Sequence, residues 1–218
     1  MATVYISSIS GLNKYDDRYE IIGEPKYIYH IEVKEIEKLL IDYLHEINRF
    51  PIHLTITTYN DYDEFETLLK RLGQEYEVNS LADVAYVSTE DSEMLKYHVP
   101  LFKVKITDGV AFESIIRTSF WMAESNCTFI LSCSDNVSII NKLGKDWKGK
   151  ETEYSTILID MTKESTSIAI THDAYGFLLF SDLEENKSFS SIINYLSVLQ
   201  MRQKRASTII IFINCIFT

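Results

Sequence analysis

The 218-residue sequence is poor in cysteine, proline and glycine, with 3, 3 and 7 residues respectively. The cysteines are Cys127, Cys133 and Cys215, an odd number without the close spacing of metal ligands. We therefore expect reduced thiols and a cytoplasmic protein. An apolar strand context around Cys127 and Cys133 predicts a raised thiol pKa rather than a reactive nucleophile. The shortage of proline and glycine leaves little room for flexible linkers.

Long apolar runs are also missing. None reaches the roughly 20 residues that a helix needs to span a bilayer. The first ten residues, MATVYISSIS, lack the basic and apolar regions of a signal peptide. We therefore expect no membrane insertion.

Basic residues are outnumbered by acidic ones, 21 to 32, which gives a formal net charge of −11. Residues 1–100 hold 19 acidic and 9 basic side chains, a net of −10, whereas residues 101–218 hold 13 and 12. Nucleic-acid binding needs a basic surface, so direct contact with DNA or RNA is not expected. An acidic half attracts a basic protein partner, although acidity also serves solubility alone.

Several sequence motifs of catalysis are missing as well. The chain has no GxSxG, GxxxxGK[ST], GxGxxG or HExxH. These patterns place a nucleophile, phosphate-binding loops and a zinc site respectively. No cofactor is expected from the sequence.

What the sequence does contain is regular hydrophobic periodicity. Helical spacing follows Ile36, with apolar residues recurring at i+3, i+4, i+7, i+8 and i+11. We predict helices over 36–47, from Asp61 to about residue 72, from Asp108 to about residue 124, and from Ser188 to about residue 205. Shorter helices are predicted over 90–98 and 135–144, followed by a charged loop over 145–153.

Strand patterns alternate with these helices. We predict strands over 3–9, 27–33, 52–59, 81–88, 101–107, 128–134, 154–161, 167–173 and 175–182. The alternation predicts an α/β (mixed α+β) fold with a mixed parallel and antiparallel sheet flanked by amphipathic helices. The close spacing of the last strands predicts an antiparallel C-terminal portion. We expect one domain over residues 1–218, with a weak point for subdivision near residue 100.

The tail over residues 208–218 is almost uncharged, β-branched and aromatic. Such a segment forms a buried strand when a partner strand receives it, and left exposed it becomes an edge prone to aggregation. We favour a buried terminal strand, with a homo-oligomer contact as the alternative.

Aspartates follow several predicted strands. They are Asp61, Asp135, Asp160, Asp173 and Asp182. Converging carboxylates at strand ends suit Mg²⁺, so Asp160 and Asp173 are the candidate metal ligands. His172 and Asp173 are the candidate catalytic pair. Helix capping and turn formation are the ordinary roles of aspartate at such places, and a regular strand would point His172 and Asp173 to opposite faces.

A second cluster combines tyrosine with carboxylate at a strand-to-helix corner, through Tyr59, Asp61, Tyr62 and Asp63. Tyrosine supplies contact area and the acids pair with lysine or arginine, so the cluster suits a protein interface. Packing explains the two tyrosines equally well.

Two classes of function remain open at this point. The first is a non-enzymatic interaction protein, of the inhibitor, immunity or adaptor type, whose acidic N-terminal half docks on a basic protein. The alternative is a divalent-metal-dependent enzyme acting on a phosphorylated or nucleotide substrate through strand-end aspartates. The second requires Asp160, His172 and Asp173 to converge. Because the first requires no motif, we favour it.

Overall fold

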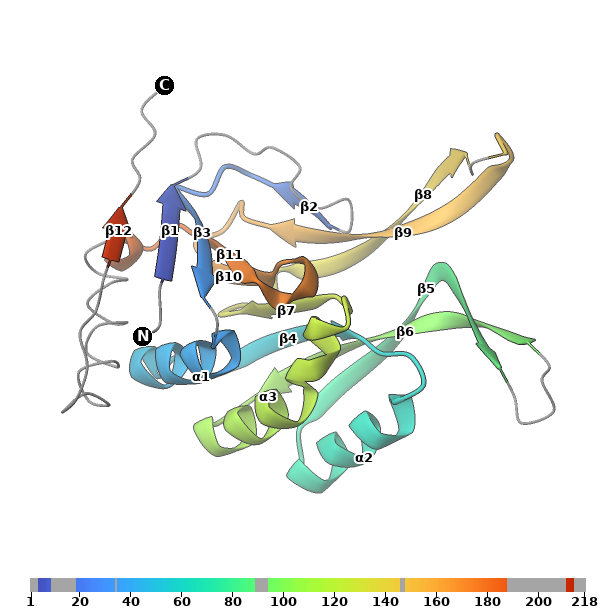
Figure 1. Ribbon diagram of the computed structural model, residues 1–218, viewed down its shortest axis with the longest axis horizontal. Coiled ribbons are helices and arrows are strands. Elements are labelled where there is room, and N and C mark those ends of the chain that lie inside the picture. Colours follow the sequence, from blue (N-terminus) through green and yellow to red (C-terminus); the bar gives the residue numbers. More distant parts are fainter. Residues whose placement is uncertain are drawn as a thin grey trace.

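A computed structural model describes residues 4–8, 19–33, 35–88, 94–145, 148–187 and 211–213. Within these residues the chain is mixed α+β and forms three layers: helices, a large sheet and a small sheet (Figure 1). The helix predicted from Ser188 lies outside the described residues. None of the described helices is long and apolar enough to cross a membrane.

The large sheet has nine strands among the described residues, and all neighbouring pairs but one are antiparallel. In spatial order they are β12 (Ile211–Ile213), β1 (Val4–Ser8), β3 (Tyr27–Val33), β11 (Gly176–Ser181), β10 (Thr166–Ile170), β7 (Phe129–Ser132), β4 (Ile52–Thr57), β6 (Met94–Ile106) and β5 (Glu75–Ser88). The hairpin of β10 and β11 confirms the predicted antiparallel C-terminal portion. The change in charge density near residue 100 lies inside β6.

The small sheet consists of β2 (Tyr19–Ile22), β9 (Glu151–Asp160) and β8 (Val137–Lys145). It combines the parallel pair of β2 and β9 with the antiparallel pair of β9 and β8. The strand predicted over 154–161 therefore exists as β9, but it belongs to this second sheet and does not neighbour β10.

The helices are α1 (Ile36–Ile47), α2 (Tyr62–Leu72) and α3 (Gly109–Glu124). Their predicted positions are confirmed. Asp108 caps α3 by accepting hydrogen bonds from the backbone N–H groups of Val110 and Ala111, each at 2.9 Å. Gly73 ends α2 in the left-handed conformation that glycine adopts without a Cβ clash.

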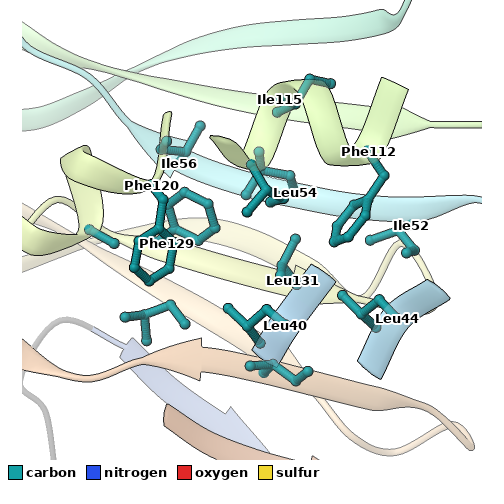
Figure 2. Packing of buried hydrophobic residues seen from close by; sticks show 14 of the residues in the cluster. Leu40, Leu44, Ile52, Leu54, Ile56, Phe112, Ile115, Phe120, Phe129 and Leu131 are labelled. Atoms are coloured by element: carbon teal, nitrogen blue, oxygen red, sulfur yellow. The ribbon is translucent and has the colours of Figure 1, made fainter. Parts of the chain in front are cut away.

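Among the described residues, the helices cover one face of the large sheet, so the predicted flanking arrangement is confirmed in part (Figure 1). Alternate residues of β4, Ile52, Leu54 and Ile56, point into this layer and are fully buried. They pack against residues of α1, α3 and β7 (Figure 2). This is the larger of the two cores.

The small sheet covers the opposite face, where a second core contains Ile130, Ile157, Ile159 and Phe180. Asn136 joins the two sheets with partly buried hydrogen bonds. Its Oδ1 accepts from Ser132 Oγ at 2.5 Å, and its Nδ2 donates to the Asp160 carbonyl at 3.0 Å.

Two predicted helices are strands in the structure. Residues 94–98 belong to β6, and residues 137–144 belong to β8. In β6, Pro100 pairs with Ser80 directly beside the register shift between Ser80 and Val84 of β5. A bulge is a position at which a strand tolerates proline, so Pro100 does not end the strand. The predicted charged loop shortens accordingly, because β8 reaches Lys145 and β9 begins at Glu151.

The tail forms a strand over Ile211–Ile213, which pairs in parallel with β1 of the same chain. The predicted terminal strand is therefore present, and it lies at one edge of the large sheet. The partner strand comes from within this chain.

Candidate functional site

The corner between β4 and α2 carries the four residues that the sequence marks for partner binding. After β4 ends, the backbone N–H of Thr58 donates to the carbonyl of Pro100 at 3.0 Å, which ties the corner to β6. Tyr59 follows and leaves 42% of its surface exposed. Asp63 is exposed in the first turn of α2, where a carboxylate suits the positive end of the helix.

Asp61 precedes α2, but its side chain makes no capping hydrogen bond. Burial, followed by the charge of Asp61, raises the pKa of Tyr97 on β6. The carboxylate of Asp61 therefore lies within electrostatic reach of Tyr97 and connects the corner to the β5–β6 hairpin.

Tyr62 is the member of the predicted set that serves packing. Its ring centroid lies 5.2 Å from that of Phe102, a fully buried residue of the larger core. The corner thus divides into an exposed Tyr59 with two acids and an inward Tyr62.

The β5–β6 hairpin extends beyond the helices as an arm (Figure 1). Near its described end three large apolar side chains are exposed: Tyr86 at 62%, Met94 at 62% and Leu95 at 53%. Leu95 pairs with Val87 across the hairpin. Sequence reasoning missed this arm, because the helix predicted over 90–98 conceals it. The signal that could have found it is a second, short alternation over 96–99, where polar Lys96 and His98 alternate with apolar Tyr97 and Val99 in the opposite phase to 101–107.

The candidate metal ligands lie apart. Asp160 ends β9, and its backbone carbonyl is bonded by Asn136, which follows β7. Asp173 follows β10 and is bonded by Asn126, which precedes β7. The two aspartates therefore lie at opposite ends of β7, and the convergence that the metal-dependent alternative requires is not observed. Among the described residues no group of three or more histidine, cysteine, aspartate or glutamate side chains could hold a metal ion.

Local hydrogen bonds account for both carboxylates. The Asp160 side chain accepts from the backbone N–H and the hydroxyl of Thr162 at 2.9 and 2.6 Å, which lowers the pKa of Asp160. Hydrogen bonds from Asn126 and then from His172 lower the pKa of Asp173. Turn formation is the arrangement observed at both positions.

His172 and Asp173 lie side by side, contrary to the orientation expected of a regular strand. Strand β10 ends at Ile170, and the two residues belong to a short 3₁₀ turn, with Nδ1 of His172 3.0 Å from Oδ2 of Asp173. Asp173 and Ala174 have positive φ angles of 56° and 48°. Asn126 holds this turn with two hydrogen bonds to Asp173, at 2.6 and 2.8 Å. Both members of the pair are exposed to solvent.

The remaining strand-end aspartates have separate partners. Asp135 accepts from Nζ of Lys103 at 2.7 Å instead of capping a helix. Asp182 is buried and accepts from the backbone N–H of Lys26 at 3.0 Å. Neither takes part in a common site. The two cysteines of the described region, Cys127 and Cys133, lie on either side of β7 and are not joined to each other, and burial raises the pKa of Cys133 as predicted.

An open hollow of about 270 Å³ lies where the small sheet stops covering the large one. Its lining combines three acidic and three basic or imidazole side chains, namely Glu75, Glu77, Asp135, His53, Lys103 and Lys105. Lys105 pairs with Glu75 at 3.0 Å, as Lys103 does with Asp135. With its charges of both signs largely paired, the hollow presents no strongly charged pocket for a small ion.

Comparisons of the chain with models of protein families, with curated proteins and with solved structures found no match. We therefore infer function from the geometry of the described residues.

Proposed function

We propose that the protein is a non-enzymatic interaction protein, of the inhibitor, immunity or adaptor type, that docks on a protein with a basic surface. The observation that carries this proposal is the exposed apolar end of the β5–β6 hairpin, at Tyr86, Met94 and Leu95. Side chains of this size are rarely left exposed together unless they meet a partner.

The proposed docking surface consists of the end of the hairpin, with Tyr86 and Met94 on one face and Leu95 on the other, together with Tyr59, Asp61 and Asp63. The backbone hydrogen bond from Thr58 to Pro100 joins the corner to β6, the strand that also carries Met94 and Leu95. Aromatic and aliphatic anchors supply affinity at an interface, whereas charges near its rim steer encounter and select the partner. The acidic charge of the N-terminal half favours a basic partner.

The proposed location is the cytoplasm. A free thiol at Cys133 is compatible with a reducing compartment. Direct binding to nucleic acid is not proposed, because the formal net charge of −11 opposes the approach of phosphates.

The test begins with a tagged chain used to capture partners from host lysate at about 50 mM and about 500 mM salt, since exposed charges are screened across this range. The partner identified is then purified and its affinity for Asp63→Lys is measured by calorimetry. We expect roughly tenfold weaker binding at low salt and a smaller difference at high salt.

A matched control is Glu164→Lys, which makes the same charge change at an exposed position. Glu164 precedes β10, at the end of the large sheet opposite to the corner between β4 and α2. It should leave affinity within about twofold of the unmodified chain, because screening removes distant charges. Equal losses from Asp63→Lys and Glu164→Lys would show that net charge alone governs association. Unchanged binding of Asp63→Lys would contradict the proposed surface.

A further inference from the structure

Strand β5 forms one edge of the nine-stranded sheet, with β6 as its sole neighbour among the described strands. The second half of this edge is protected. It contains the bulge after Ser80, and β9 covers it through hydrogen bonds of Ser155 with the N–H of Ala82 at 2.7 Å and the carboxylate of Asp83 at 3.1 Å. Bulges and covering segments are the devices with which proteins protect sheet edges.

The first half, residues 75–80, has neither device. Every residue in it except Tyr76 is exposed. A strand at an edge presents N–H and C=O groups on its outer side, at the spacing that another extended chain requires.

The side chains of this open half alternate in chemistry. Glu75 and Glu77 point to the face of the hollow, whereas Tyr76 and Val78 point to the helix face, with Val78 40% exposed. Lys105 opposite Glu75 pairs with it, but Lys103 opposite Glu77 pairs with Asp135. No ion pair involves Glu77 among the described residues.

We propose that residues 75–80 accept an extended segment of the partner as an additional strand, one whose side chains alternate between basic and apolar. Basic residues would lie beside Glu75 and Glu77, and apolar residues beside Tyr76 and Val78. In strand addition the main chain supplies affinity and the alternating side chains supply specificity. The inference depends on the proposed function, because it names the partner element that a basic protein would contribute.

Charge argues against a second copy as the occupant. Two copies paired antiparallel through this edge would set their glutamates on the same face of the joint sheet. Like charges at neighbouring cross-strand positions oppose pairing. A basic segment instead meets an edge of complementary charge.

The test uses ¹⁵N-labelled full-length protein and a capped hexapeptide that alternates lysine and valine. We expect its addition to shift the backbone amide signals of residues 75–80 in a saturable way. Glu77→Lys should weaken binding roughly tenfold. In the double variant Glu75→Lys with Glu77→Lys, the preference should reverse toward a hexapeptide that alternates glutamate and valine.

Two controls separate strand addition from attraction by charge. The first is the same lysine–valine peptide with every backbone nitrogen methylated, which keeps every charge but has no backbone N–H group to donate. It should not bind. The second is Glu64→Lys, an equal charge change on the exposed side of α2, which should bind the original peptide within about twofold of the unmodified chain.

Binding of the methylated peptide as tightly as the original would overturn the inference, as would amide shifts that avoid residues 75–80. The proposed function would survive such a result if Asp63→Lys still weakened the purified partner. Conversely, if the affinity of the partner is the same for Asp63→Lys, for Glu77→Lys and for the unmodified chain, both the docking surface and the edge proposal are contradicted.

Discussion

The two faces of the large sheet are covered in different ways. On the helix face, apolar side chains of every central strand meet three amphipathic helices and form one continuous core. On the opposite face, the small sheet covers an apolar area around β7, β10 and β11, and polar side chains follow at the hollow where that cover ends. Adjacent residues of β6, Phe102 and Lys103, illustrate the difference, since they point to opposite faces.

This difference shows how one strand meets two environments. A strand between two apolar layers is apolar on both sides, as in β7 and β11, where every residue is buried. A strand that extends past the second layer alternates instead. The alternation of 101–107, interpreted from sequence as half exposure, marks the place where the small sheet stops.

The largest effect is expected for Phe102→Ala on the helix face. The Phe102 ring contacts the rings of Tyr62, Phe65 and Tyr76, with centroids 5.1–5.8 Å away. Removing a fully buried phenylalanine leaves a cavity and should lower the free energy of unfolding by about 3–5 kcal/mol. Urea unfolding monitored by circular dichroism measures this loss. The neighbouring change Lys103→Ala should cost less than about 1 kcal/mol, because it removes a partly exposed ion pair. Comparable losses at both positions would contradict the difference between the faces.

A smaller effect is expected at the junction of the two sheets. Asn136→Ala removes the amide that bonds Ser132, Ser167 and the Asp160 carbonyl. Leaving these groups without partners should lower the free energy of unfolding by about 1–3 kcal/mol. The exposed Asn141 of β8 is the matched position, and Asn141→Ala should change stability by less than about 0.5 kcal/mol. Thermal unfolding of both variants makes the comparison. Equal, small changes would mean that the sheets are held together by apolar packing alone.

The smallest effect concerns the hollow and pH. Burial lowers the pKa of His53, an effect partly opposed by Asp135. The unfolded chain therefore binds a proton at His53 before the folded chain does, so stability falls as the pH drops below the ordinary value of 6.5. In His53→Gln this part of the pH dependence should disappear, as measured by urea unfolding at several pH values between about 7.5 and 5. An identical pH dependence in both proteins would show that His53 is not desolvated in the folded state.

Helices α1, α2 and α3 could be predicted from sequence because their apolar spacing is a local property. In α1 four residues of the predicted apolar face, Ile36, Leu40, Tyr43 and Leu44, are buried, and Leu39 is partly buried. The stop at Gly73 likewise depends on one residue and its backbone conformation. Periodicity and end signals suffice for such elements, since tertiary packing agrees with them.

Local signals failed in two long hairpins, β5–β6 with its bulge and β8–β9 with a regular register. The charged segment ending at His98 and the segment 137–144 suggest short helices, yet both form strands whose partners lie elsewhere in the chain. Pro100 misled for the same reason, because its tolerance depends on the bulge opposite it. Hydrogen bonding and packing between the paired strands of a hairpin outweigh a weak local preference for helix.

The candidate sites divide in a similar manner. The tyrosine and acid corner was visible in sequence, because its members are adjacent, and the structure keeps Tyr59 and Asp63 exposed there. The exposed apolar hairpin and the open edge of β5 were not visible. Exposure and edge position depend on which strands lie at the edges of a sheet. A local sequence pattern does not indicate the order of the strands.

The sequence by itself determined helices α1, α2 and α3, most strands and the acidic N-terminal half. Hydrophobic period and charge are properties of neighbouring residues. The tertiary structure alone decided that β9 joins a second sheet, that Asp160 and Asp173 lie at opposite ends of β7, and that His172 meets Asp173 in a turn. Each of these outcomes depends on contacts between residues far apart in the chain. Their free energy is set by burial and hydrogen bonding across layers, which only the folded arrangement specifies.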